Sequence, residues 1–241
     1  MHIVLKPASR AASAGNAVSE WRARGLRVEI IEPEGKASRG RQIASARARG
    51  KTRGEKKEKL YVAEIRAMLF GDAVGFSRLS EAQLLAFFSN FQLLVARLMR
   101  KSKHRPEVVD TWGDGLYLVF RTVHDAGRFS LELRERIRKV DWTTVGLPGS
   151  MSLRVGLHAG PVYSCTDPIT EQPTFIGTNV TRAARLEPIT LPGEVYVSAD
   201  FAALAAAENV DDFSCEYVGI IPAAKGFGDF PTYVLRPRAV A

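Results

Sequence analysis

Two stretches decide how this chain is interpreted: residues 67–77, Ala-Met-Leu-Phe-Gly-Asp-Ala-Val-Gly-Phe-Ser, and residues 109–119, Val-Asp-Thr-Trp-Gly-Asp-Gly-Leu-Tyr-Leu-Val. In each, an apolar run typical of a strand lies next to an aspartate, Asp72 or Asp114, and a glycine-containing turn. Turns at strand ends are where metal and phosphate sites are commonly built. Either aspartate alone would be an ordinary turn residue. As a pair of hard oxygen ligands they suit Mg²⁺ or Mn²⁺, so together the stretches predict a carboxylate metal site.

Around these stretches the pattern alternates between strand and helix from about residue 60 onward. Ser80 and Gln83 have the spacing of a helix capping box, and apolar residues then keep helical spacing from Leu84 to Leu98. A hairpin is expected over 108–120, turning at Gly113 and Asp114. The other expected elements are strands over 60–69, 152–158, 194–197 and 213–221 and helices over 125–138, 179–187 and 202–207. The order β-α-β-β-α-β predicts an α+β, ferredoxin-like fold in which helices cover one face of an antiparallel sheet.

The formal net charge of +8 is concentrated in one segment. Residues 35–59 contain ten basic and two acidic side chains, so the remaining residues sum to zero. A basic face on a folded domain would favour a nucleic-acid partner, whereas a basic segment beside a neutral domain is typical of a solvated tether. We therefore interpret 35–59 as a linker and expect no nucleic-acid partner. Contact of this linker with RNA, an anionic membrane surface or an acidic protein is the alternative.

The domain organisation follows from these boundaries. Residues 1–34 predict a small βαβ-like extension, with strands over 2–6 and 26–31 and a helix over 17–24, and residues 60–241 form the main domain. No stretch reaches the eighteen or so apolar residues of a membrane span, and the N-terminus lacks the apolar core of a signal peptide. Cys165 and Cys215 belong to no paired framework, which suits a reducing compartment. The expected location is the cytoplasm.

Several motifs in this region resemble those of one enzyme family. Residues 70–80 and 111–120 resemble the two metal-binding signatures of the class III nucleotidyl cyclases, the adenylyl and guanylyl cyclase fold. Residues 153–162 resemble that family's central strand, 175–187 its helix with transition-state residues, and 224–233 its closing turn. The motifs occur in the family's order and cover most of the chain. The resemblance implies the cyclase fold with extra strands at the C-terminal end.

The resemblance also implies which residues act. Asp72 and Asp114 would hold two Mg²⁺ or Mn²⁺ ions, with the Ala73 carbonyl completing one coordination shell. Arg185 matches the arginine that stabilises charge on the α-phosphate. Thr181 stands where the family usually has an asparagine that orients the ribose. Backbone N–H groups would bind the polyphosphate at Val74, Gly75, Phe76 and Ser77.

The positions that read the base depart from the usual pattern. Asp110 stands where adenylyl cyclases have a lysine, and Thr174 stands at the second base-reading position. An ionised Asp110 accepts hydrogen bonds but cannot donate one to adenine. The phosphate-binding lysine of the closing turn is replaced by Phe227, and Lys225 lies two residues earlier. His158 matches no catalytic position of the family and is expected to be structural.

The leading hypothesis is a metal-dependent cyclase that makes a 3′,5′-cyclic nucleotide from a nucleoside triphosphate. Because one chain carries both metal aspartates and Arg185, the resemblance implies a homodimer with shared sites. The absent lysine favours a pyrimidine product, cyclic UMP or cyclic CMP, as in bacterial anti-phage defence. Cyclic AMP or cyclic GMP in ordinary signalling is the alternative. A further alternative is a degenerate module that binds a nucleotide without catalysing a reaction. Thr181 and Phe227 favour this alternative.

Overall fold

The computed structural model describes residues 2–5, 27–30, 61, 63–223 and 226–238, and the chain divides into two units, 1–63 and 64–241. In the first unit, strands β1 (His2–Leu5) and β2 (Arg27–Ile30) pair in parallel, with Ile3 opposite Val28. Parallel pairing needs a crossover between the strands, as a βαβ-like fragment has. The helix expected over 17–24 and the linker over 35–59 lie outside the described residues.

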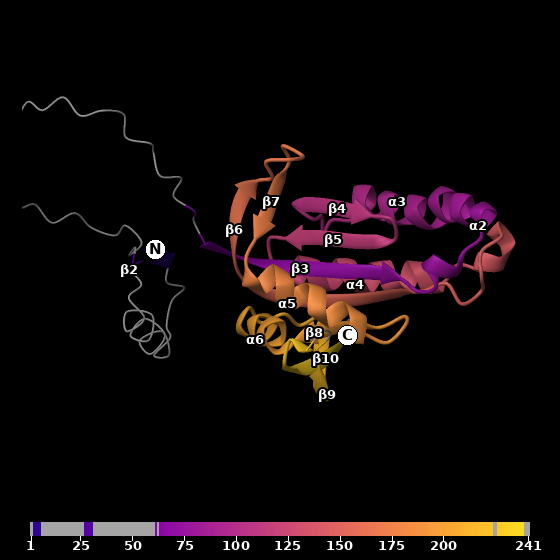
Figure 1. Cartoon of the computed structure of the whole chain (residues 1–241). Coiled ribbons are helices and arrows are strands. Elements are labelled where there is room, and N and C mark those ends of the chain that lie inside the picture. The colour runs from indigo at the N-terminus through magenta and orange to yellow at the C-terminus, as the bar shows by residue number, and fades with distance from the viewer. Residues whose placement is uncertain (1, 6–26, 31–60, 62, 224–225, 239–241) are drawn as a thin grey trace, which may run out of the picture. The chain divides into compact units, whose positions relative to one another are not determined.

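The second unit is built on one mixed sheet with the strand order β4-β5-β3-β6-β8-β10-β9, and β7 pairs with β6 (Figure 1). The first four strands have the ferredoxin-like order, which confirms the predicted α+β fold. The sheet is not wholly antiparallel, since β6 and β8 run parallel. Its strands are β3 (Ala63–Ala73), β4 (Val108–Trp112), β5 (Gly115–Phe120), β6 (Leu153–Thr166), β7 (Pro173–Ile176), β8 (Val195–Ser198), β9 (Phe213–Pro222) and β10 (Asp229–Pro237).

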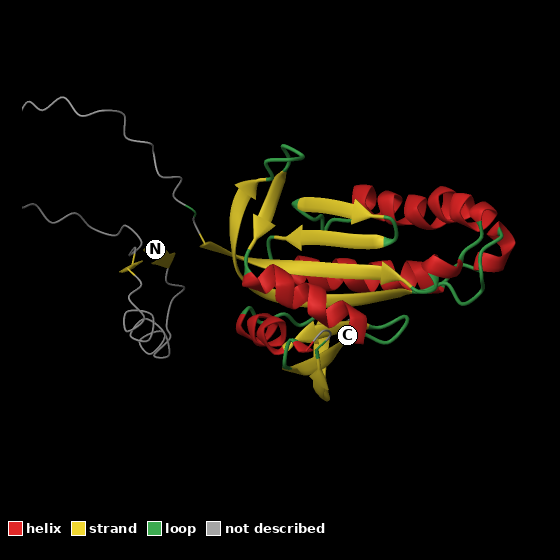
Figure 2. Ribbon diagram, viewed as in Figure 1, coloured by secondary structure: helices red, strands yellow, loops and turns green. Residues whose placement is uncertain are grey.

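Helices lie on both faces of this sheet (Figure 2). The longer ones are α3 (Leu93–Lys101), α4 (Val123–Arg138), α5 (Thr178–Leu186) and α6 (Ala199–Ala207); the shorter ones are α2 (Glu81–Ala86), the π-helical turn η2 (Phe87–Gln92) and the 3₁₀ turns η1 (Phe76–Arg78), η3 (Trp142–Val145) and η4 (Glu187–Ile189). The main core joins η2, α3, α4 and α6 to one face of the sheet. A smaller core joins α5 and β7 to the other face. The expectation of a single helical face was therefore incomplete.

The alternation of side chains along the strands explains the two cores. On β5, Leu116 and Leu118 belong to the main core, whereas Tyr117 and Val119 belong to the smaller one. Successive strand residues point to opposite faces, so a strand that is buried on both faces has no polar side. This is why all six residues of β5 are buried.

The predicted helix start is confirmed at Ser80. The Ser80 hydroxyl accepts from the Gln83 backbone N–H at 3.4 Å, and the Ser80 N–H donates to the Gln83 side chain at 3.0 Å. Within the described chain, residues 81–101 form the one helix that is long and apolar enough, by length and composition, to cross a membrane. This differs from the expectation that no segment would qualify. Phe87 and Phe91 of this helix are buried in the main core, although 22% of its apolar window is buried in all.

The π-helical turn within this helix was not predicted. At η2 the hydrogen-bonding pattern widens, and Phe87 and Phe91 stack with ring centroids 4.8 Å apart. The turn ends at Gln92, whose side chain donates to the Gly113 carbonyl at 2.8 Å. Turns of this kind often occur at functional sites. Here the turn connects the helix to the hairpin that carries Asp114.

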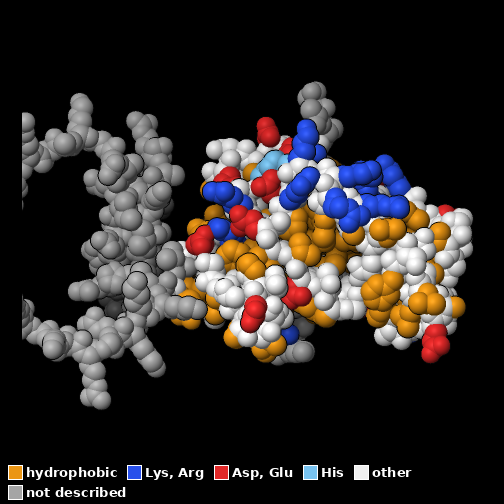
Figure 3. Space-filling model, turned by 90° about the horizontal axis from the view of Figure 1, so that it is seen from above, with side chains coloured by type: hydrophobic (Ala, Val, Ile, Leu, Met, Phe, Trp, Pro, Cys, Tyr) orange, Lys and Arg blue, Asp and Glu red, His pale blue; other side chains and the backbone are white. Residues whose placement is uncertain are grey.

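Lys and Arg side chains gather on part of one face of the second unit, beside acidic side chains and a histidine (Figure 3). The C-terminal turn of α3 contributes Arg100 and Lys101 to the basic surface of this unit. Basic side chains at a helix C-terminus are favoured by the helix dipole. A local basic group of this kind is compatible with a net charge of −1 over residues 64–241, which contain 19 basic and 20 acidic side chains.

A substitution at Gly156 on β6 tests how closely η4 packs against the sheet. A Cβ there would lie 2.6 Å from the backbone N of Glu187, too close for any side chain. We expect Gly156→Ala to lower the free energy of unfolding by about 1–3 kcal/mol, because η4 must move away from the sheet. Chemical denaturation monitored by circular dichroism measures this.

Gly71→Ala on β3 is the matched control. A Cβ at Gly71 would meet its nearest atoms at 3.5 Å, an ordinary contact. We expect it to leave stability unchanged or slightly raised, because alanine has less freedom in the unfolded chain. Equal destabilisation by both substitutions would contradict the packing of Gly156 against η4.

Candidate active site

The sheet brings Asp72 and Asp114 together. Strands β3 and β5 pair antiparallel with Gly71 opposite Leu116, so the end of β3 that carries Asp72 lies beside the β4–β5 turn that carries Asp114. Gly113 adopts a left-handed backbone (φ +65°) in this turn, a conformation that favours glycine. Two residues that are distant in the sequence thereby share one end of the sheet. Ala73, the last residue of β3, is buried next to them.

Two further charged residues complete the cluster, and the sequence did not identify them. Arg154 on β6 forms an ion pair through Nη2 with Asp72 Oδ2. Its Nε lies 3.0 Å from Glu187 Oε1, at the start of η4. Gly156 allows η4 to approach β6 closely enough for this contact. The site therefore contains three carboxylates and one guanidinium.

The pKa values of Asp114 and Glu187 are raised in this cluster, where carboxylates outnumber guanidinium groups. Burial, and then the charge of Asp72, raises the pKa of Asp114 to about 6. Burial raises the pKa of Glu187 to about 7, although Arg154 opposes this, and Asp72 and Asp114 add to the rise. A rise caused by burial and neighbouring negative charge means that the site lacks positive charge. A cation bound between these carboxylates would relieve it.

The loop after β3 only partly fulfils its predicted role. The Val74 N–H donates to the Ser152 carbonyl at 2.9 Å, so this N–H group is already used within the protein. Gly75 has a left-handed backbone (φ +84°) and leads into η1, which begins at Phe76 and includes Ser77. The first N–H groups of a helical turn have no partner within the turn. Gly75, Phe76 and Ser77 therefore remain candidates for phosphate binding, whereas Val74 does not.

The two predicted base-reading residues lie on either side of Tyr117. Asp110 is exposed on β4 and directly opposite Tyr117 on β5. The Tyr117 hydroxyl donates to the Phe175 carbonyl at 3.3 Å, next to Thr174 on β7. Burial, and then the nearness of Asp110 and Cys165, raises the pKa of Tyr117 well above its usual range. Cys165 is the cross-strand partner of Thr174, so these observations place Asp110 and Thr174 near one ring.

Arg185 and Thr181 lie on α5, on the face of the sheet opposite the main core. The Nε atom of Arg185 is buried and has no hydrogen-bond partner among the described residues. In the part of the chain that the structure describes, no ion pair joins Arg185 to Asp72 or Asp114. Lys225 lies outside the described residues, and Phe227 is exposed and packs edge-on against Phe230.

His158 is a structural residue. It is buried on β6, and its ring nitrogens lie 2.7 Å from the Ser198 hydroxyl and 2.9 Å from the Asn179 side-chain oxygen. Burial lowers its pKa. The histidine therefore links β6 to the starts of α5 and α6.

Part of this chain is similar in sequence to a segment of a much longer protein. A relative described as a serine/threonine-protein kinase/receptor, R826 of Acanthamoeba polyphaga mimivirus, is 28% identical over 120 residues, which are 43% of this chain and 7% of that protein. The chain thus spans a small part of that relative's length.

Two solved structures have a similar fold. One is the guanylate cyclase domain of RhGC from Catenaria anguillulae in complex with GTP, with a TM-score of 0.60, 22% identity and coverage of 73% of this chain and 98% of that one. The other is the adenylyl cyclase CyaB from P. aeruginosa, with a TM-score of 0.65, 18% identity and coverage of 75% and 97%.

The family model of the adenylate and guanylate cyclase catalytic domain matches residues 60–237, the whole of the sheet and its helices in the second unit. The matched range includes Asp72, Asp114, Arg154 and Arg185. The chain therefore belongs to the adenylate and guanylate cyclase catalytic domain family and is a nucleotidyl cyclase.

Proposed function

We propose that this cyclase converts a nucleoside triphosphate into a 3′,5′-cyclic nucleotide and pyrophosphate at the cluster of Asp72, Asp114, Arg154 and Glu187. In this reaction the ribose 3′-hydroxyl attacks the α-phosphate of the same molecule and pyrophosphate leaves. Phosphoryl transfer depends mainly on positioning and on neutralising charge. The observation that carries the proposal is the excess of carboxylates over cations in a partly buried cluster.

The residues present fit a divalent metal. Asp72 and Asp114 are carboxylates at adjoining chain turns, and the raised pKa of Asp114 reflects burial beside another negative charge. Carboxylate oxygens are the ligands that Mg²⁺ and Mn²⁺ prefer. When bound, such ions neutralise polyphosphate charge and lower the pKa of the attacking hydroxyl. We assign Asp72 and Asp114, with the Ala73 carbonyl, as the ligands for two ions.

The remaining groups bind and orient the substrate. Arg154 is partly exposed, at 30% of its side chain, and its guanidinium lies beside Asp72, where it can meet the polyphosphate. Glu187 Oε1 forms an ion pair with Nε of this guanidinium and so adds negative charge beside it. The N–H groups of Gly75, Phe76 and Ser77 and the Lys225 side chain are the other proposed phosphate contacts. Thr181 is proposed to orient the ribose.

The metal assignment predicts a complete loss of turnover. Asp72→Ala or Asp114→Ala should reduce activity at least about a thousandfold, because several kcal/mol of transition-state charge stabilisation are lost. Pyrophosphate release with Mn²⁺ measures this, and circular dichroism verifies that the variants fold. Asp211→Ala, at an exposed aspartate between α6 and β9, is the control and should keep full activity. Near-normal activity of either site variant would refute the assignment.

Arg185 is proposed to act on the substrate of a partner subunit. It has no ion pair with Asp72 or Asp114 within the described part of this chain, and its Nε is unpartnered. A symmetric homodimer would bring Arg185 of one chain to the metal aspartates of the other and build two sites. In that position the permanent charge and planar shape of its guanidinium suit the α-phosphate.

A homodimer with shared sites predicts that two inactive variants restore activity when they are mixed. Asp72→Ala and Arg185→Ala proteins should each be inactive alone, and a mixture should regain activity because one site of the heterodimer is intact. If half of the dimers are mixed and each has one site, about a quarter of wild-type turnover is expected. Mixing Asp72→Ala with Asp114→Ala is the control and should restore nothing. Absence of recovery after demonstrated subunit exchange would mean that one chain builds the site.

The base-reading residues support a pyrimidine substrate over adenine. Asp110 and Thr174 lie near the same tyrosine, so they can act on one ligand. An ionised Asp110 accepts from the N–H of uracil or the amino group of cytosine, but it cannot donate to N1 of adenine. We propose cyclic UMP or cyclic CMP as the product, a signal of the anti-phage type. Guanine also offers donors to a carboxylate, so cyclic GMP is the purine alternative.

This assignment predicts that ATP is not the best of the four nucleoside triphosphates. Asp110→Asn should change the ranking of substrates more than the maximal rate on the best one, because an unmatched polar group discriminates strongly. The products formed with Mn²⁺ are identified by mass spectrometry. Asp141→Asn, at an aspartate in the cap of η3, is the control and should leave the ranking unchanged. Preference for ATP together with unchanged ratios in Asp110→Asn would show that Asp110 does not face the base.

The same assay separates the cyclase from a degenerate module. Thr181 and Phe227 depart from the family pattern, whereas Asp72, Asp114 and Arg185 are all present. A protein that binds nucleoside triphosphates but releases no pyrophosphate with either Mg²⁺ or Mn²⁺ would be the degenerate module.

A further inference from the structure

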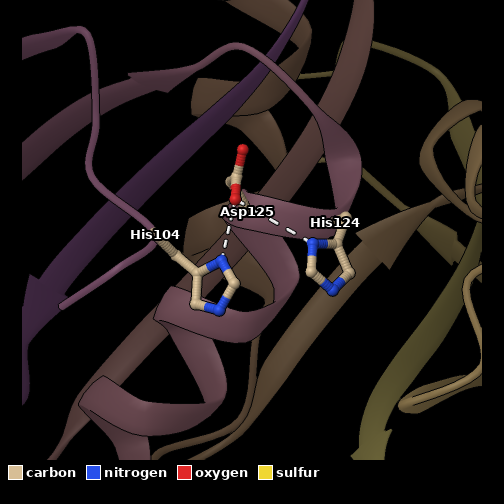
Figure 4. Close-up of side chains that lie close together, drawn as sticks. All are labelled: His104, His124 and Asp125. Carbon is tan, nitrogen blue, oxygen red and sulfur yellow. Dashed lines mark hydrogen bonds and ion pairs between the residues drawn. The ribbon is translucent and has the colours of Figure 1, made fainter.

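A cluster of two histidines and one aspartate lies away from the proposed active site. His104 belongs to the loop between α3 and β4, and His124 and Asp125 lie in the first turn of α4. Both rings point a nitrogen toward the same carboxylate oxygen of Asp125, and the two rings lie edge-on to each other with centroids 5.1 Å apart (Figure 4). Strand β5 separates this cluster from the turn with Asp114, and its six residues span about 20 Å. The cyclase reaction proposed above does not use the cluster.

The geometry of the cluster suits a metal ion. His104 Nδ1 lies 2.7 Å and His124 Nδ1 3.9 Å from Asp125 Oδ1. One nitrogen or oxygen from each residue lies within 4.8 Å of the others. Tetrahedral zinc ligands at about 2.0–2.1 Å from the ion are about 3.4 Å apart. Side-chain rotation alone can therefore draw the three atoms around one ion.

Neighbouring side chains contact the three ligand residues, as is common in metal sites. While Nδ1 of His124 faces Asp125, its Nε2 lies 3.1 Å from Asp212 Oδ2. In metal sites the second nitrogen of a ligating histidine commonly donates to a carboxylate, which fixes the ring. The other oxygen of Asp125 accepts from the Thr122 hydroxyl at 2.8 Å. Arg128 in turn holds Asp212, with Nε 3.2 Å from Oδ2.

The charge of this corner also favours a cation. Two carboxylates contact the histidines of the cluster: Asp125 lies against His104, and Asp212 lies against His124. Asp212 Oδ1 is buried and has no hydrogen-bond partner among the described residues. Glu208 lies close enough to interact with His124. These carboxylates outnumber Arg128 and offset the partial positive charge at the start of α4.

We propose that His104, His124 and Asp125 form a Zn²⁺ site, with Asp212 orienting His124 and the fourth position left to water. Two imidazole nitrogens and one carboxylate oxygen are ligands that zinc accepts and that Mg²⁺ does not favour. The ion would join the α3–β4 loop to the start of α4. Through Asp212 it would also connect the loop that precedes β9.

The test is zinc binding by the full chain in an Asp72→Asn/Asp114→Asn background, which removes the two carboxylates assigned as active-site metal ligands. The chelator-stripped protein is titrated with Zn²⁺ against a chromophoric chelator. We expect one equivalent to bind tightly, and affinity to fall at least a hundredfold in His104→Gln and in His124→Gln. His2→Gln is the matched control and should bind as the parent does. Asp212→Asn should weaken binding tenfold to a hundredfold.

A second measurement needs no substitution in the cluster. In the parent, ¹⁵N NMR of the imidazole rings identifies which nitrogens respond to Zn²⁺, and we expect large shifts at Nδ1 of His104 and His124. This keeps the proposal testable where a histidine variant does not fold. Failure of the folded parent to bind zinc at micromolar concentrations would overturn the proposal. Binding that leaves both rings unshifted, or survives both histidine substitutions, would also overturn it.

Discussion

Three carboxylates share one guanidinium at the end of the central strands, and the catalytic half of this protein depends on that arrangement. Arg154 contacts both Asp72 and Glu187, whereas Asp114 forms no ion pair among the described residues, and burial and the charge of Asp72 raise its pKa. Such a cluster is costly unless the surrounding sheet holds it rigidly. The two apolar cores provide this rigidity, because they bury β3 and β5 on both faces. The sheet thus keeps like charges together in a position where a bound cation stabilises them.

The sequence predicted the parts of this arrangement that depend on local signals. Ser80 and Gln83 marked a helix start correctly, and the glycines around Asp114 marked the hairpin turn. It did not reveal Arg154 or Glu187, because their contact depends on Gly156 letting two segments meet. One signal was available: Arg154 is a single charged residue in the otherwise apolar run Leu153-Arg-Val-Gly-Leu157. A charge at that place in a central strand needs a partner.

Other differences have similar causes. The resemblance predicted a closing turn over 224–233, yet Asp229–Pro237 pairs with β8 and β9 and forms strand β10. Val74 was expected to offer its N–H to phosphate, but Ser152 from a distant loop accepts that hydrogen bond. The cluster around His124 joins the start of α4 to His104, about twenty residues earlier in the loop before β4, and no sequence motif marked this pairing. Tertiary contacts decide each of these cases, and a single sequence does not contain them explicitly.

The π-helical turn η2 restricts the number of residues that this part of the helix can contain. A π turn contains one residue more per hydrogen-bonded loop than an α-helix, so it absorbs an inserted residue without unwinding the helix. Removing one residue between Phe87 and Gln92 would restore a regular helix but change the positions of the side chains within this turn. Either Phe87 or Gln92 would then leave its place, the core or the Gly113 carbonyl. The length of this short segment is therefore fixed by the core and by the turn that bears Asp114 at the same time.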